Sequence, residues 1–189
     1  MNSVFRGRMK AAWIVLALTL VSGQASADVE KTALTCESKI CLYWWPRLPA
    51  VKGWHQDRDK SYELGANVLV PDGSSFSDAD TVMYAEAFYK PRVPDIASVE
   101  VLIDGDKKKF LDHSPDMKIV ESKGLATGDG KVLRSFQFIP GRQGDWEQVA
   151  YGEEGDFYLI FTVSSRTETG YAKSISAYEG LIQSYREKP

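Results

Sequence analysis

The sequence predicts an α+β domain: a mostly antiparallel sheet of five to seven strands with helices packed on its faces. Two observations lead to this prediction. Residues 145–164 contain two extended segments around a glycine-bounded turn, and an apolar stripe with helical spacing follows them. Strands joined by a short turn pair antiparallel. An amphipathic helix packs its apolar stripe on a core, so the sheet is expected to carry a helix.

The chain begins with a segment typical of a secretory signal peptide. Three basic residues within the first ten precede an apolar run over residues 11–21, and Ala25-Ser26-Ala27 supplies the small residues that cleavage requires. The run is too short to cross a membrane as a helix, which takes roughly 20 residues. We expect removal of residues 1–27 and a periplasmic or secreted protein without a membrane span. An uncleaved membrane anchor is the alternative.

The expected mature chain is mildly acidic. Without residues 1–27 it holds 20 Lys and Arg against 26 Asp and Glu, a formal charge of −6. Such a protein gains nothing from counterion release at a phosphate backbone or from attraction to anionic lipid, so nucleic acid is not an expected partner. Its length of about 160 residues suits one domain, made of a disulfide-containing, Trp- and Pro-rich segment over residues 28–60 and the main α/β region over 61–189.

The two cysteines, Cys36 and Cys41, are predicted to form a disulfide. Both lie in the exported part of the chain, and an oxidising compartment favours pairing of two close cysteines. The alternative is a metal or redox pair, but no second cysteine pair and no nearby histidine would complete a tetrahedral metal site. We therefore expect no metal site and no cofactor.

Residues 42–54, with the sequence LYWWPRLPAVKGW, have no sustained period and are predicted to form an ordered aromatic loop. They contain Trp44, Trp45 and Trp54. Indole rings combine a large apolar area with a polar group, so the three form a candidate binding surface. The alternative is that they cover the open edge of a core.

The main region begins with strands and then changes period. Strands are predicted over 66–70 and 81–89, each followed by turn residues that include proline. Residues 95–111 have apolar positions near helical spacing and follow Pro94, which predicts a helix. Further extended segments are expected at 118–121 and 131–139.

The last part of the chain carries the strongest patterns. Residues 145–151 and 156–164 predict a hairpin, with Gly152 and Gly155 bounding its turn. A C-terminal helix follows, with Ser165 and Glu168 as a predicted capping box. Its stripe steps by four, three, four and three residues through Tyr171, Ile175, Tyr178, Ile182 and Tyr185.

These segments together resemble the PsbP-like fold family. The likeness rests on the strand and turn ANVLVPDG, the helix after YKPRVPD, the strand pair GDWEQVAYGEEGDFYLIFTVSSR and the final helix AYEGLIQSYR. It covers the chain from about residue 62 to the C-terminus. The resemblance implies an α-β-α sandwich that serves as a binding or accessory module and implies no shared active site.

No catalytic signature stands out in the sequence. There is no G-x-S-x-G, P-loop or dinucleotide fingerprint. His113 with Asp112 and Asp116, and the acidic pairs at 78–80 and 104–106, are interpreted as solvated surface groups. Residues 164–166 fit an anion site at a helix N-terminus, although capping alone explains the two serines.

These observations favour an exported, non-catalytic binding or accessory protein of the cell envelope, whose partner is a protein or a small ligand. One alternative is an immunity protein against an envelope-acting toxin, because an acidic surface suits a basic effector. Another is a small hydrolase that uses a carboxylate pair such as Asp112 and Asp116.

Overall fold

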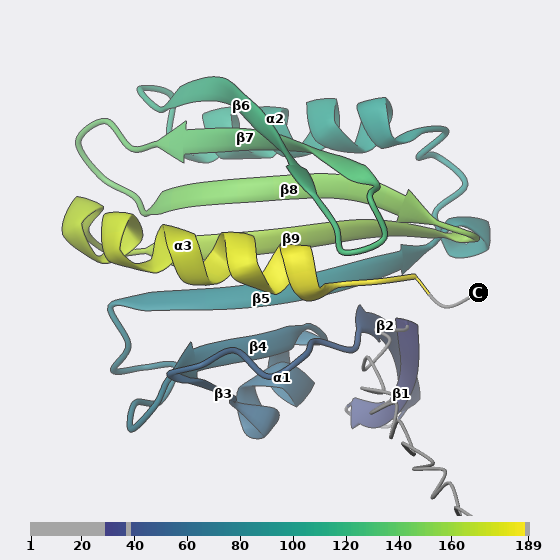
Figure 1. The fold of residues 1–189 in the computed structure, drawn as a ribbon. Coiled ribbons are helices and arrows are strands. Elements are labelled where there is room, and N and C mark those ends of the chain that lie inside the picture. The colour runs from purple at the N-terminus through teal and green to yellow at the C-terminus, as the bar shows by residue number, and fades with distance from the viewer. Residues whose placement is uncertain (1–28, 37–38, 188–189) are drawn as a thin grey trace, which may run out of the picture.

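The computed structural model describes residues 29–36 and 39–187, and the side chains of 34–36 are outside the described part. These described residues form one sheet, three α-helices and a short 3₁₀ helix, arranged as in Figure 1. In chain order the elements are β1 (Val29–Cys36), β2 (Lys39–Pro46), β3 (Trp54–Gln56), α1 (Arg58–Leu64), β4 (Asn67–Pro71), β5 (Thr81–Tyr89), η1 (Lys90–Arg92), α2 (Val99–His113), β6 (Lys118–Ala126), β7 (Val132–Ile139), β8 (Trp146–Glu154), β9 (Phe157–Ser165) and α3 (Glu168–Ser184).

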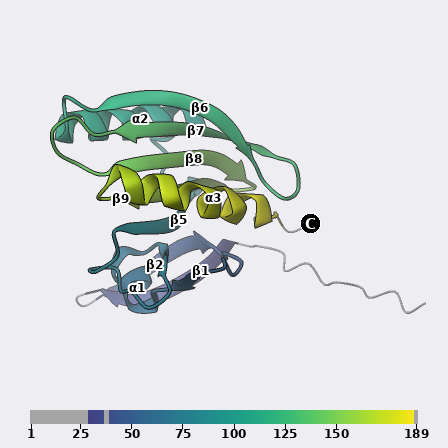
Figure 2. The same cartoon turned by 60° about the vertical axis from the view of Figure 1, so that its left-hand side comes forward.

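The described sheet is antiparallel at every pairing, as predicted, but it has nine strands where five to seven were expected. Its main path runs β1-β2-β5-β9-β8-β7-β6, and β4 also pairs with β5 and carries β3 at its other edge. Figures 1 and 2 show the β1–β2 hairpin and the β6–β7 pair at opposite ends of the molecule. The long strands β5, β9 and β8 therefore form the centre.

Helix α3 covers one face of these central strands (Figure 1). Its residues Tyr178, Leu181 and Ile182 are fully buried in a cluster with apolar side chains from β5, β8 and β9. The Tyr178 hydroxyl donates a hydrogen bond to the Phe161 carbonyl at 2.8 Å, so its buried polar atom is satisfied. The apolar stripe predicted for the C-terminal helix is thus the part of α3 that packs on the sheet.

Helix α2 lies on the opposite face of the sheet, where it covers part of β7, β8 and β9. Leu102 and Ile103 of α2 pack there against Phe136, Phe138 and Tyr151. The rest of this face, over β5, the start of β8 and the end of β9, is not covered by α2. The structure is thus a mixed α+β fold with helices of unequal coverage on its two faces.

The N-terminal segment differs most from the sequence prediction. Residues 42–54 were expected to form a loop, yet 42–46 belong to β2, and Trp54 begins β3. Strand β2 pairs along its whole length with β1, but it meets the main sheet at one residue pair, Trp44 opposite Ala87. Since this pairing depends on a neighbouring strand, local sequence pattern did not reveal it.

Several predicted boundaries shift in the structure. Helix α2 begins after the N-cap Ser98 rather than at residue 95, and α3 is capped by Thr167, whose side chain accepts from the Gly170 N–H, rather than by Ser165. The β8–β9 turn is also shorter than predicted. Strand β8 continues to Glu154, and Gly155 adopts a positive φ of 51° in the tight connection.

Two predictions for the N-terminal part fall on undescribed residues. The signal peptide over residues 1–27 lies outside the described part, and no helix of the described residues is long and apolar enough to cross a membrane. The β1–β2 register sets Cys36 opposite Lys39 and Cys41 opposite Leu34. Because the Cys36 side chain is not described, the disulfide stays a prediction.

Candidate functional site

A cleft of about 380 Å³ opens on the α2 side of the sheet, where α2 leaves the central strands uncovered. Its floor comes from β5, β8 and β9, and one wall comes from the segment around α1 and β4. Alternation along β5 explains the floor, because Val82, Tyr84 and Glu86 point to the cleft while Met83 and Ala85 point to the α3 side. One strand therefore supplies both a core and a site.

The strand register arranges the floor in rows across the three strands. Val82, Ser164 and Glu147 stand opposite one another in the first row. The next row contains Tyr84 and Thr162. Directly opposed side chains on one face lie close together, so the register brings a carboxylate, two hydroxyls and a phenol into one small area.

Glu147 is the most unusual group of the floor. Its Oε1 accepts a hydrogen bond from the Ser164 hydroxyl at 2.8 Å, while its Oε2 is buried with no hydrogen-bond partner among the described residues. Burial raises the pKa of Glu147 to about 7, with a further contribution from the Asp145 carboxylate, although the Ser164 hydrogen bond acts in the other direction. The carboxyl group therefore exchanges its proton near neutral pH.

Glu86 is a second carboxyl group with a perturbed environment, at the other end of the cleft. Burial raises its pKa, the Asp106 carboxylate on α2 raises it further, and Lys109 lowers it. Lys109 also pairs with Asp106, with 3.0 Å between Nζ and Oδ1. Burial likewise raises the pKa of Tyr84, and Glu147 and Glu86 add to this shift, so the Tyr84 phenol stays protonated.

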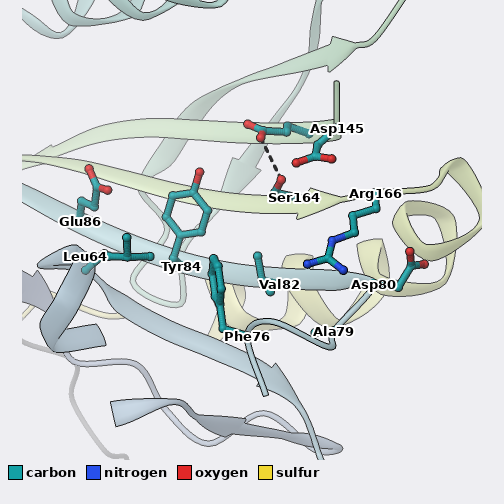
Figure 3. A pocket seen from close by; sticks show the side chains of 12 residues that line it. Leu64, Phe76, Ala79, Asp80, Val82, Tyr84, Glu86, Asp145, Ser164 and Arg166 are labelled. Atoms are coloured by element: carbon teal, nitrogen blue, oxygen red, sulfur yellow. Dashed lines mark hydrogen bonds between the residues drawn. The ribbon is translucent and has the colours of Figure 1, made fainter. Parts of the chain in front are cut away.

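Among the described residues at the rim of the cleft, Arg166 is a cation among several carboxylates. Arg166 points into the cleft with Asp145 nearby (Figure 3). Its Nη2 donates to the Ser77 carbonyl at 2.9 Å, and its backbone N–H donates to the Asp80 carbonyl. The Asp80 carboxylate accepts from the Thr167 hydroxyl at 2.7 Å. These contacts fix the β4–β5 loop against the start of α3.

Apolar side chains complete the cleft. The rings of Phe76 and Tyr84 stand beside each other in Figure 3, with Leu64 and Val82 on either side. Among the described residues no three His, Cys, Asp or Glu side chains are placed to hold a metal ion. The arrangement suits a ligand that donates hydrogen bonds to carboxylates and has an apolar body.

The structure does not bring the three predicted tryptophans together. Trp44 and Trp45 are adjacent on β2, so their side chains point to opposite faces. Trp45 is only 4% exposed and packs against Tyr62, whereas Trp54 packs against the α3-side core. The three therefore do not form one continuous surface.

Trp44 keeps a place beside a hollow. Its ring stacks on Tyr89 with 5.4 Å between centroids, and the Arg92 guanidinium lies 4.8 Å from the ring centre. These residues line a hollow of about 280 Å³ that shares Leu64 and Glu86 with the main cleft. Of the three tryptophans, Trp44 is thus the one that lines a hollow, and a binding role for these side chains stays a prediction.

Asp112 and Asp116, the predicted carboxylate pair, lie on the surface with partners. Asp112 pairs with Lys108, and Asp116 pairs with Arg142 at 3.2 Å. The Arg142 backbone N–H is the main cause that lowers the pKa of Asp116, which keeps this carboxyl ionised. Asp112 and Asp116 thus form two separate ion pairs.

The hydroxyl groups of the two serines before α3 also form hydrogen bonds within the protein. Ser164 donates to Glu147, and Ser165 accepts from the Thr81 hydroxyl at 2.8 Å while its own hydroxyl lies near two backbone carbonyls. They build the floor of the cleft and the junction with α3, which explains both serines without an anion.

Sequence reasoning did not single out Tyr84, Glu86 or Glu147. Glu86 and Glu147 interrupt segments that were correctly predicted as strands, 81–89 and 145–151. A carboxylate in the middle of a predicted strand, or near its start, was the available signal. This signal points to a site only once the strand order is known, because β5 and β8 lie on either side of β9 and their carboxylates therefore share one cleft.

Comparison with known proteins identifies a fold resemblance and no family. No family model matches the sequence, and no curated protein is similar to it. Among solved structures the chain is similar to cyanobacterial PsbP from Synechocystis sp. PCC 6803, with 16% sequence identity, 90% of this chain and 99% of that chain covered, and a TM-score of 0.47. This similarity agrees with the PsbP-like resemblance of the sequence.

Proposed function

We propose that this chain is a non-catalytic binding or accessory protein of the cell envelope that holds a small ligand in the cleft over β5, β8 and β9. The observation that carries the proposal is the buried Oε2 of Glu147, which has no hydrogen-bond partner among the described residues and belongs to a side chain that lines the cleft. An unsatisfied buried polar atom costs stability, so its retention beside a cleft favours a role in binding.

The predicted export signal supports the envelope location in this proposal. The fold is proposed as a variant of the PsbP-like α-β-α sandwich in which α2 covers only part of its face. The uncovered part provides the room that the ligand needs.

Filling the cleft tests the proposal. Val82 projects into the cleft from β5 (Figure 3), so Val82→Trp is expected to occupy much of the open volume. Val132→Trp is the matched control, because Val132 is 68% exposed and lies outside the cleft. Both purified variants and the native mature domain would be screened by thermal shift against a small-molecule library.

A ligand that raises the melting temperature of the native domain and of Val132→Trp, but not of Val82→Trp, supports the cleft. Ligands that stabilise all three proteins equally would place binding elsewhere. If no member of a broad library stabilises the native domain, the small-ligand proposal is overturned.

A small hydrolase is the second candidate, favoured by one observation. A carboxyl group with a pKa of about 7 can give or take a proton at neutral pH. If the cleft is hydrolytic, purified protein should release product from nitrophenyl esters or glycosides with repeated turnover, and Glu147→Gln should abolish it. Turnover that survives this substitution would exclude Glu147 as the acid or base.

A further inference from the structure

We propose, on the basis of the proposed binding function, that the ligand of the cleft is a linear aliphatic polyamine. One ammonium group is bound at Glu147 and a second at Glu86, with the aliphatic chain between them. Four features of the cleft support this assignment: its charge, the free oxygen of Glu147, its apolar walls and the separation of the two glutamates.

The charge of the lining favours a cation. Among the described residues that line the cleft, four carboxyl groups face one guanidinium, and that guanidinium, on Arg166, already donates to the Ser77 carbonyl. A cleft lined mainly by one sign of charge concentrates ligands of the opposite sign. The four carboxyl groups belong to Asp80, Glu86, Asp145 and Glu147.

Glu147 supplies the hydrogen-bonding position. Within the described part of the chain no group donates to its Oε2, whereas Oε1 accepts from the Ser164 hydroxyl. The terminal torsion of a glutamate side chain is soft, so rotation of the carboxyl group turns a free oxygen toward the cleft. An ammonium donor there forms a charge-assisted hydrogen bond, which is stronger than a neutral one.

The apolar walls of the cleft, and the lack of a metal-binding arrangement among the described residues, favour an organic cation over a metal ion. No three described carboxylate, imidazole or thiol groups converge on one point, as a metal would require. The cleft that holds Glu147 and Glu86 is instead also lined by Val82, Phe76 and Tyr84, and Figure 3 shows these three side chains in the cleft with Glu86. An aliphatic chain buries apolar area against such side chains.

The register gives the ligand its length. Glu147 stands on β8 opposite Ser164, whereas Glu86 stands on β5 opposite Ile160. The two glutamates are two strands and four residues apart, so roughly 16 Å separates their Cα atoms. A single small ammonium ion cannot contact both carboxylates, but a chain with an ammonium at each end can.

Binding of this kind is coupled to pH, because ammonium groups bind the ionised carboxylates and the raised pKa values of Glu147 and Glu86 mean that protons are released on binding. The titratable and charged groups that surround the two glutamates, from every adjoining element, are Asp80 before β5, Tyr84 on β5, Arg92 in η1, Asp145 and Tyr151 around β8, Arg166 after β9, and Asp106 and Lys109 on α2.

Titration calorimetry with spermidine tests the proposal on the mature domain. We expect one binding site, with affinity about tenfold lower at pH 5.5 than at pH 8 and with proton release near pH 7. Glu147→Gln and Glu86→Gln are each expected to weaken binding by about tenfold. Glu179→Gln, an equal charge change on the exposed side of α3, should leave the affinity unchanged.

The control arms separate the ligand classes. Pentylamine, with one ammonium, should bind more weakly than spermidine and should be sensitive to one of the two glutamate substitutions only. A tri-lysine peptide tests whether the ammonium groups belong to a partner protein. Binding of tri-lysine without binding of spermidine overturns the free-polyamine assignment.

Equal spermidine affinity in the native domain and both cleft variants would also overturn it, as would an equal loss in Glu179→Gln. Circular dichroism and melting temperature confirm that the variants are folded, and two separate glutamate variants keep the test valid if one fails to fold. If spermidine does not bind but the thermal-shift screen finds a ligand whose effect is lost in Val82→Trp, the polyamine assignment is refuted and the binding function is retained. If spermidine does not bind and the screen finds no such ligand, the polyamine assignment and the small-ligand function are both refuted.

Discussion

The two faces of the central sheet differ although the same strands build them. On the α3 side, β5, β8 and β9 present Met83, Ala150 and Phe161, all fully buried under the helix. On the α2 side the same strands present Glu86, Glu147 and Ser164 to an open cleft. One face is a packed apolar core, while the other combines partial burial with polar groups.

This difference distinguishes residues that stabilise the fold from residues that are candidates for ligand binding. Apolar burial under α3 stabilises the fold at about 25 cal/mol per Å². A buried carboxylate with an unpartnered oxygen opposes stability. Such a group beside a cleft is a candidate for function because its cost is offset when a ligand binds.

The largest expected effect comes from breaking the α3 side. Leu181→Ala removes a fully buried side chain from the core and should lower the free energy of unfolding by about 3–4 kcal/mol. Leu64→Ala, at a cleft position that is 47% exposed, should cost less than about 1 kcal/mol. Urea unfolding of both variants measures the contrast, and equal losses would contradict the assignment of the core to α3.

A smaller effect is expected from the pH dependence of the cleft side. The folded protein holds the Glu147 proton up to about pH 7, whereas the unfolded chain releases it near pH 4.3. The folded state binds more protons between these values, so its stability decreases as pH rises through this window. The loss due to Glu147 should reach about 2–3 kcal/mol.

Urea unfolding from pH 4.5 to pH 8 measures this contribution as the difference between the native protein and Glu147→Gln. Glu179→Gln should keep the native pH profile. If Glu147→Gln also follows the native profile, burial does not hold the proton on this carboxyl group.

The smallest expected effect is at the junction of the two sides. A Cβ on Gly170, in the first turn of α3, would clash with the Asp80 carboxylate and the Ser165 hydroxyl. Gly170→Ala should therefore destabilise the fold by about 2 kcal/mol. Gly180→Ala, in the same helix with no atom within 4 Å of its added Cβ, should stabilise it by about 0.5–1 kcal/mol. Melting temperatures that shift in the same direction would contradict the tight junction.

Prediction from sequence was accurate where a pattern is local. The β8–β9 hairpin and α3 were predicted from alternation, glycines and helical spacing. The prediction failed for residues 42–46, because β2 is held by pairing with β1 and by the contact between Trp44 and Ala87. It also missed the N-caps Ser98 and Thr167, since several neighbouring polar residues can each accept the same backbone N–H groups.

The candidate site was less accessible to sequence reasoning than the fold. The three tryptophans attracted attention as a group, but strand alternation sends Trp44 and Trp45 to opposite faces. Glu86 and Glu147 lie 61 positions apart in the chain. Their placement in one cleft follows from the order β5-β9-β8.

The sequence by itself determined the α+β class, the antiparallel pairing of its clearest hairpin and the apolar stripe of the last helix, because each depends on near neighbours in the chain. Only the tertiary structure decided that α2 leaves part of its face open and that Glu147 is buried there with no partner for Oε2 in the part of the chain that the structure describes. Burial and strand order are properties of contacts between distant segments, so the pKa and accessibility of a side chain follow from the fold.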